Sequence, residues 1–369
     1  MKTLSKILKN VKSNVSVCHF YSFGFLAFSL AASVFFNSNS ALTEQIYYRL
    51  IYSNFRWLWD HSFSFLPLPV IYIWLAFVFT YTFYSFYQYF KNKVKYTKLI
   101  INLLCFISLH ICWFYWAWGY NYNRIQLGIR WNLYSDITEN EFIEALKEQT
   151  QLVGTLRIAD SIILDAPMQN PLALESEVRK LINNFQESHG FLSFSGIRCR
   201  DLKPSGFLLI WAASGVYLPF CSESQIDAGL SVYSKPFTIA HELSHGMGWT
   251  HEGDCNLIAY LACRNSKNPY IRYCAELNYW RYLLSHASRN FSEIYNQTIS
   301  QIPLKVKSDL LSIHEANNRY PEFLPNFRNW FYEWYLIKNG IQSGQKSYTE
   351  LIPMLINYKK KNQEDFYNE

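Results

Sequence analysis

The sequence predicts a mainly α-helical protein with a minor β component, in which three N-terminal transmembrane helices precede an α-rich domain with a small sheet. Three observations support this fold class: long uncharged stretches fill the first third, helical spacing recurs through the remainder, and one short apolar tract is interrupted by Gly and Pro. The composition agrees, because 50% of the 369 residues are hydrophobic and only 17% are charged. Such a composition excludes a disordered chain, which needs low hydrophobicity and high charge.

Three stretches without a charged side chain occupy most of the first third. Each is long enough to cross a hydrocarbon core of ~30 Å, which takes about 20 helical residues. Tryptophans near one end, such as Trp113, Trp116 and Trp118, suit the aromatic belt of a membrane interface. We therefore predict three transmembrane helices. The uncharged stretches, each followed by its apolar centre, are 13–43 with 19–36, 61–90 with 66–88, and 99–123 with 99–118.

Lysines set the expected orientation of these helices. One cluster precedes the first helix and another separates the second from the third, whereas the loop between the first two has only Arg49 and Arg56 as basic residues. Positively charged loops stay in the cytoplasm, so everything after about residue 120 is expected outside. A rival interpretation of the first stretch is a cleaved signal peptide ending near 38–41, which leaves the later topology unchanged. The clustered lysines are Lys2, Lys6, Lys9, Lys12, Lys91, Lys93, Lys95 and Lys98.

These signals divide the chain into a cytoplasmic basic N-terminus at 1–18, three transmembrane helices with short loops at 19–123, and an extracytoplasmic domain at 124–369. The last part holds slightly more acidic than basic residues, so it offers no basic surface for nucleic acid. Five of the eight cysteines lie in that domain, and their pairing cannot be read from sequence.

The outer domain is predicted to be mostly helical. Thr138 and Glu141 have the spacing of a capping box, which predicts a helix from there to about residue 150. Pro171 begins a second helix with apolar residues at helical spacing, ending near Gly190. The apolar tract 207–220 is too short and too broken for a fourth span and predicts one or two strands. Further helices are expected at 236–248, 252–264, 268–286, 304–318, 325–338 and 347–361.

One motif carries chemistry: residues 241–245 read H-E-x-x-H. Residues four apart share one face of a helix, so His241 and His245 can reach a single zinc ion. Glu242 projects beside that ion, where it can take a proton from the water that zinc activates. The motif therefore predicts Zn²⁺ as cofactor, with His241 and His245 as ligands and Glu242 as general base.

Two neighbouring residues compete for the third zinc ligand. His251 completes the spacing H-E-x-x-H-x-x-G-x-x-H and resembles the metzincin signature, but that class needs a downstream Met-turn and only Met354 follows. Glu252 begins a predicted helix on which Asn256 shares its face, so Glu252 could bind zinc while Asn256 orients a ligand histidine. This pair resembles the E-x-x-A-D element of membrane metallopeptidases. We favour Glu252 over His251, with Asp254, Cys255 or a distant residue as further alternatives.

Weaker candidates surround the motif. A helix after it carries Arg281, Tyr279 and His286, any of which could donate a hydrogen bond to a developing oxyanion. The tract 207–220 could provide an edge strand for substrate. Glu223 and Asp227 lie just before the motif helix and are expected to be solvated loop carboxylates.

Over nearly its whole length the chain resembles the uncharacterised bacterial membrane family catalogued as protein of unknown function 3810. Members commonly have E-D-E-A-N at 252–256 and generally lack a histidine at position 251, which favours Glu252 as ligand. The family has no assigned activity, so the resemblance implies an architecture and a zincin-like site but no substrate. The resemblance rests on the three-span start and on residues 118–122, 216–220, 236–245, Glu252 with Asn256, 258–261, 335–340, Gly344 and 347–348.

These observations together predict a membrane-anchored zinc metallopeptidase in which His241, His245 and Glu252 hold zinc. The expected location is the bacterial inner membrane, multi-pass, with the C-terminal domain on the periplasmic side. The expected partners are the lipid bilayer and a peptide or protein substrate, and no nucleic acid. The alternative is a non-catalytic membrane scaffold or envelope protein with a structural zinc ion or no metal.

Overall fold

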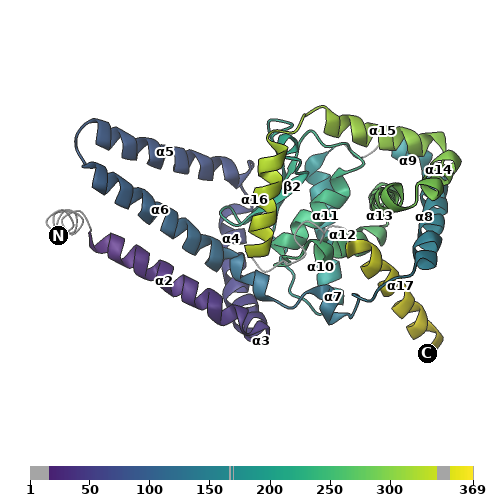
Figure 1. Ribbon diagram of the computed structural model, residues 1–369, viewed down its shortest axis with the longest axis horizontal. Coiled ribbons are helices and arrows are strands. Elements are labelled where there is room, and N and C mark those ends of the chain that lie inside the picture. Colours follow the sequence, from purple (N-terminus) through teal and green to yellow (C-terminus); the bar gives the residue numbers. More distant parts are fainter. Residues whose placement is uncertain (1–15, 166–167, 169, 339–349, 369) are drawn as a thin grey trace. The chain divides into compact units, whose positions relative to one another are not determined.

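The computed structural model describes residues 16–165, 168, 170–338 and 350–368. It divides into two compact units, and the mainly α-helical fold with a minor sheet is confirmed (Figure 1). Most of the predicted cytoplasmic segment 1–18 lies outside the described residues. The first unit comprises Met1–Arg124 with Leu218–Glu223, and the second comprises Ile125–Tyr217 with Ser224–Glu369.

Three long apolar helices dominate the first unit: α2 (Val17–Asn37), α5 (Val70–Phe90) and α6 (Tyr96–Ala117). Each is long and apolar enough to cross a membrane, as the sequence predicts. Helix α6 packs against both α2 and α5 (Figure 1). Most of their apolar side chains face outward, which suits lipid because no water is present there to penalise apolar surface.

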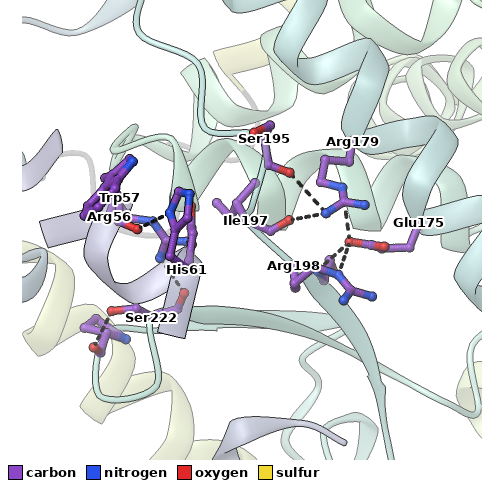
Figure 2. A network of polar contacts seen from close by, with 12 residues as sticks. Arg56, Trp57, His61, Glu175, Arg179, Ser195, Ile197, Arg198 and Ser222 are labelled. Atoms are coloured by element: carbon purple, nitrogen blue, oxygen red, sulfur yellow. Dashed lines mark hydrogen bonds and ion pairs between the residues drawn. The ribbon is translucent and has the colours of Figure 1, made fainter. Parts of the chain in front are cut away.

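The segment between the first two long helices is helical, where the sequence led us to expect a loop. It forms α3 (Ser40–Leu42), the π-helix η1 (Thr43–Tyr52), and α4 (Ser53–Phe63). Its charges are paired inside the unit: Arg56 is 1% exposed, pairs with Asp60 and donates to the Ser222 carbonyl oxygen at 2.5 Å (Figure 2). Arg56 is thus a structural residue of this helical segment rather than a solvated loop charge.

The segment Leu218–Glu223 connects two strands and packs within the first unit. The Phe220 ring stacks on Trp74 at 5.1 Å between centroids. Glu223 Oε2 accepts a hydrogen bond from the Val70 amide at 2.8 Å, so it satisfies the start of α5. Glu223 is only 3% exposed, and its prediction as a solvated carboxylate is wrong because it serves a buried backbone donor.

Two buried helices form the centre of the second unit: α11 (Lys235–Gly246) and α12 (Glu252–Arg264). Both pack against each other, against α10 (Pro171–Ser188) and against α13 (Pro269–Asn290). Outer contacts come from α8 on α13 and from α17 on α12. The remaining helices, including α8 and α17, are α7 Leu127–Arg130, α8 Glu139–Ala159, α9 Ser161–Asp165, α14 Ser292–Gln301, α15 Leu304–Asn318, α16 Pro325–Lys338, α17 Leu351–Asn368, η2 Gly119–Asn123 and η3 Leu209–Trp211.

Most predicted helix positions agree with these bounds. The capping box is present, with the Thr138 amide donating to Glu141 at 2.8 Å, but α8 continues nine residues beyond the predicted end. Its later part is held by the ion pair of Arg157 with Asp309. Helix α14 was not predicted, and none of its residues is buried. The first residues of the predicted helix 347–361 lie outside the described residues, and α17 begins at Leu351.

A three-stranded sheet of order β1-β3-β2 lies beside α11. Its strands are β1 (Cys199–Leu202), β2 (Gly215–Leu218) and β3 (Glu223–Asp227), with β1 parallel to β3. Of the predicted strand region 207–220, only β2 is extended. Asp227 is fully buried, because its carboxylate accepts hydrogen bonds from backbone amides at Gly206, Leu208 and Leu209; its prediction as a solvated loop carboxylate is therefore wrong.

Polar contacts from α10 fix the chain that leads into β1 (Figure 2). Glu175 accepts a hydrogen bond from Arg198 Nε at 3.1 Å. Arg179, one turn further along the helix, donates to the carbonyl oxygens of Ser195 and Ile197 at 3.1 and 3.3 Å. The sheet thus gains a fixed position relative to α10, which itself packs on the central helices.

A buried ion pair joins α8 to α15, and we expect its loss to destabilise the second unit. Arg157 Nε lies 2.6 Å from Asp309 Oδ2, both residues are at most 3% exposed, and Tyr273 donates to the same oxygen at 2.6 Å. Arg157→Ala leaves a buried carboxylate without its cation and should cost about 3–5 kcal/mol of unfolding free energy. Denaturant unfolding of the full chain in detergent measures this. Arg289→Ala, at an exposed position, is the control; an equal loss in both variants would contradict the expectation.

Candidate metal site

The H-E-x-x-H motif lies on α11, which is buried along nearly its whole length. Pro236 stands in the first turn, where its missing amide hydrogen costs nothing. Gly246 near the other end permits close packing, because a Cβ there would lie 1.9 Å from Ile197 Cδ1. The Ser224 hydroxyl donates to the Glu242 carbonyl oxygen at 2.7 Å and attaches the helix to β3. The motif is therefore held on a rigid central helix.

A tight turn connects α11 to α12. Gly248 has φ +89°, a left-handed conformation that favours glycine, and its amide donates to the His245 carbonyl oxygen at 2.9 Å. The chain reverses there, and α12 begins at Glu252. A carboxylate in the first turn of a helix is favoured by the helix dipole. The turn thus places Glu252 opposite the two motif histidines.

Three side-chain atoms meet in a nearly equilateral triangle. His241 Nε2 lies 3.1 Å from Glu252 Oε2, His245 Nε2 lies 3.5 Å from the same oxygen, and the two nitrogens are 3.2 Å apart. Ligands bound to zinc at ~2.0–2.1 Å in a tetrahedron are about 3.3 Å from one another. The three residues are at most 9% exposed. The group therefore has the composition, spacing and burial of a site that could bind a metal.

Hydrogen bonds orient the rings of both histidines. His241 Nδ1 lies 2.9 Å from Asn256 Oδ1, and His245 Nδ1 lies 2.9 Å from the Trp249 carbonyl oxygen. Both partners accept hydrogen bonds, so each Nδ1–H donates away from the triangle and each Nε2 atom faces it. Such partners behind a metal-binding histidine orient the ring and raise its basicity. The Cys255 thiol also lies 3.3 Å from His245 Nδ1, on the side away from the triangle.

The two glutamates of the site are in opposite electrostatic situations. Burial raises the pKa of Glu252, but the nearby imidazoles of His245 and His241 outweigh this and hold the pKa below its ordinary value. The Glu252 carboxylate thus remains ionised, as a metal ligand must be. For Glu242, burial dominates and raises the pKa, against the opposing effect of the two histidines. An upward shift is the direction expected for a general base, which works best when its pKa lies closer to the working pH.

The Glu242 side chain extends from α11 toward the edge strand β2. Its carboxyl accepts a hydrogen bond from the Tyr217 backbone amide. A Cβ at Gly215 would lie 2.7 Å from Glu242 Oε1, so only glycine leaves the carboxyl its present position. Glu242 Oε2 is buried and has no hydrogen-bond partner among the described residues. One oxygen of the predicted base thus remains available beside the histidines.

The structure does not bring His251 to the triangle. His251 stands at the N-terminal boundary of α12, and its Nε2 lies 3.3 Å from Glu350 Oε2. Tyr134 lies 3.5 Å from its other ring nitrogen. Asp254, another alternative ligand, accepts hydrogen bonds from two backbone amides at the start of α7. Both residues therefore serve packing contacts of α12, and Glu252 is the residue that reaches the histidines.

The sequence pointed to three candidate residues on α13, and the structure shows what two of them contact. Tyr279 is fully buried against Tyr260, and His286 packs on Phe142 at 4.8 Å, so both have packing roles. Arg281 has intermediate exposure, and the partial burial of its guanidinium group lowers the pKa of that group.

The residue that sequence reasoning missed is Tyr282, whose hydroxyl donates to Asn256 Oδ1 at 3.4 Å. Asn256 therefore receives a hydrogen bond from α13 while it orients His241 on α11. Burial raises the pKa of Tyr282 to about 12, so its hydroxyl keeps its proton at neutral pH. A position next to Arg281 gave no signal of this contact, because it depends on how α13 packs against α12.

Fold and site define a class: a mainly α-helical protein whose three apolar helices suggest membrane association and whose buried His-His-Glu group could bind a metal. The chain belongs to the family described as Protein of unknown function (DUF3810), which matches residues 47–356. This confirms the family suggested by the sequence. No curated protein and no solved structure matches the chain. The family description states no activity.

Proposed function

We propose that this protein is a membrane-anchored zinc metallopeptidase. The observation that carries the proposal is the His241–His245–Glu252 triangle with the Glu242 carboxyl beside it. Two histidines and a glutamate are the ligand set of many zinc peptidases, and the triangle has the spacing that zinc requires. The orientation of both histidines and the ionised state of Glu252 fit a divalent cation as well.

The number of donors supports a catalytic rather than a structural role. Among the described residues, the group of metal-binding side chains has three members. A structural zinc site is closed by four protein ligands, whereas a catalytic site keeps one position for water or substrate. This count weighs against the alternative of a scaffold protein with a structural zinc ion.

In the proposed reaction, a bound zinc ion supplies a Lewis acid, which lowers the pKa of water and polarises the scissile carbonyl group. Glu242 takes a proton from the attacking water and later returns it to the nitrogen of the leaving amine. The hydrogen bond from the Tyr217 amide holds the Glu242 carboxyl toward β2. His241 and His245 keep their Nε2 atoms facing the site through the contacts at Asn256 and Trp249.

A peptide is the substrate class that the site favours. β2 stands at the edge of the described sheet next to β3, and extended peptides commonly bind along the edge strand of a sheet. Gly215 brings this strand against the Glu242 carboxyl. A peptide bound along β2 would therefore present its backbone carbonyls near the predicted base.

The location is part of the proposal. The apolar helices suggest membrane association, and the lysines at 91–98 favour the cytoplasm for the connection between α5 and α6. The domain with the site would then lie on the periplasmic side of a bacterial inner membrane. Its partners would be the bilayer and a peptide or protein substrate rather than nucleic acid.

Metal removal tests the function directly. The full chain, purified in detergent and loaded with zinc, is incubated with a membrane-protein extract, and newly formed amino termini are identified by mass spectrometry. We expect cleavage to stop after treatment with a chelator and to return when zinc is added back. Cleavage that persists in the metal-free protein would overturn the proposal. Circular dichroism before and after chelation separates loss of catalysis from unfolding.

A further inference from the structure

The accessible face of α13 lies beside the candidate metal site. Between residues 273 and 285, the residues that are not buried are Asn278, Arg281, Tyr282 and Ser285. Their spacing of i, i+3, i+4 and i+7 places them on one side of the helix. The Tyr282 hydroxyl donates to Asn256 Oδ1 at 3.4 Å, and the same oxygen lies 2.9 Å from His241 Nδ1. One accessible side of α13 thus reaches the metal site.

Arg281 stands next to Tyr282 on this face. Burial raises the pKa of the Tyr282 hydroxyl, the Arg281 cation lowers it, and the Glu252 carboxylate raises it again. The hydroxyl therefore lies within electrostatic reach of both the cation and the carboxylate that completes the triangle. Arg281 thus brings a positive charge from α13 to the edge of the candidate metal site.

Arg281 is not paired with an anion of the described chain. Among the residues that the structure describes, none forms a hydrogen bond or an ion pair with its guanidinium group. Burial lowers the pKa of that group, and the phenol of Tyr282 rather than a carboxylate opposes this effect. Arg157 on α8, in contrast, lies beside the carboxylate of Asp309. Arg281 is therefore a partly desolvated cation without a fixed counter-ion in the described part of the chain.

A cation in this position suits an anionic ligand. Removing a charge from water costs free energy, which folded proteins usually offset with a partner of opposite charge. A guanidinium group presents its N–H donors in a planar fork that matches the oxygens of a carboxylate or a phosphate. Where the described chain supplies no such partner, a bound molecule can supply it. The intermediate exposure of Arg281 leaves its side chain accessible to that molecule.

We propose that Arg281 binds a carboxylate group of the peptide substrate and so determines which peptides the site accepts. The inference rests on the proposed function, because an unmodified peptide offers carboxylates and no phosphate. The carboxylate comes from one of two sources, which are the C-terminus of the peptide and an Asp or Glu side chain. In either case the contact lies beside the metal site, so it fixes the peptide relative to the bond that is cleaved.

Affinity selection with peptide pools tests this. The full chain carries Glu242→Gln, so that bound peptides are not hydrolysed, and it is loaded with zinc in detergent. It is incubated with four pools of random decapeptides, which have a free or an amidated C-terminus and either contain or lack Asp and Glu. Retained peptides are counted by mass spectrometry. Peptides with a carboxylate should be retained roughly 10- to 100-fold better than the pool without one, as hydrogen bonds to a charged group predict. Arg281→Gln should remove this preference.

The matched control is Arg289→Gln, which removes the same charge from an exposed position on the same helix and should leave the preference unchanged. Retention of the amidated pool with Asp and Glu identifies a side chain as the source, and retention of the free pool without them identifies the C-terminus. Equal retention of all four pools overturns the proposal. A preference that survives Arg281→Gln also overturns it, because the zinc ion or another cation then binds the carboxylate.

Denaturant unfolding of the same variants tests for a structural role. The described residues give Arg281 no partner to lose, so Arg281→Gln should unfold at the same denaturant concentration as its parent or at a higher one. A variant that fails to fold, or that is destabilised as strongly as Arg157→Ala, would show that Arg281 serves the fold and would overturn the proposal. Because the selection measures binding and not cleavage, failure of this inference and failure of the proposed peptidase activity are seen in separate experiments.

Discussion

Glu242→Gln is expected to abolish peptide hydrolysis while the protein keeps its zinc. Glutamine has the shape of glutamate and can still accept the hydrogen bond from the Tyr217 amide, but its amide group cannot take a proton from water. Loss of a general base lowers the rate by roughly 100- to 10,000-fold. None of the three residues of the triangle changes, so the metal content should stay that of the wild type.

The measurement counts new amino termini produced in a membrane-protein extract by zinc-loaded wild type and variant. Glu315→Gln is the matched control, because it makes the same chemical change at an exposed position on α15. Wild type and the control should produce the same termini at the same rate, and Glu242→Gln should produce none above background. A variant as active as wild type would remove Glu242 from the mechanism.

Glu252→Ala is expected to remove zinc from the protein, whereas His251→Ala should leave it bound. The structure places Glu252 Oε2 at 3.1 and 3.5 Å from the two histidine nitrogens, but turns His251 toward Glu350. Loss of one ligand of three takes away a charged donor that helps to hold the cation in a buried site. Adjacent residues thus give opposite outcomes in one experiment.

Elemental analysis of the purified full chain measures the effect. Wild type and His251→Ala should contain about one zinc per chain, as a single three-ligand site predicts, and Glu252→Ala very little. Circular dichroism shows whether each variant is folded. If His251→Ala loses the metal and Glu252→Ala keeps it, the third ligand is wrong; if the wild type takes up none when zinc is supplied, the metal site itself is wrong.

Local sequence predicted most helices correctly because their signals lie within one element. The capping box at Thr138, Pro171 at the start of α10 and the long uncharged stretches each specify a helix without help from the rest of the chain. The helices between residues 40 and 63 were missed for the opposite reason. Their charged residues look solvated in sequence and are buried only through pairs such as Arg124 with Glu44.

The sequence by itself determined two of the three residues of the triangle, because His241 and His245 are four residues apart and such residues share one face of a helix. It left His251 and Glu252 as rivals for the third residue, because neighbouring residues at a helix start differ only in the direction in which they project. The turn at Gly248 and the packing of α12 on α11 decided that direction. Packing also brought Tyr282 to Asn256 and β2 to Glu242. These contacts join residues far apart in the chain, so their geometry depends on the whole folded core rather than on any local spacing.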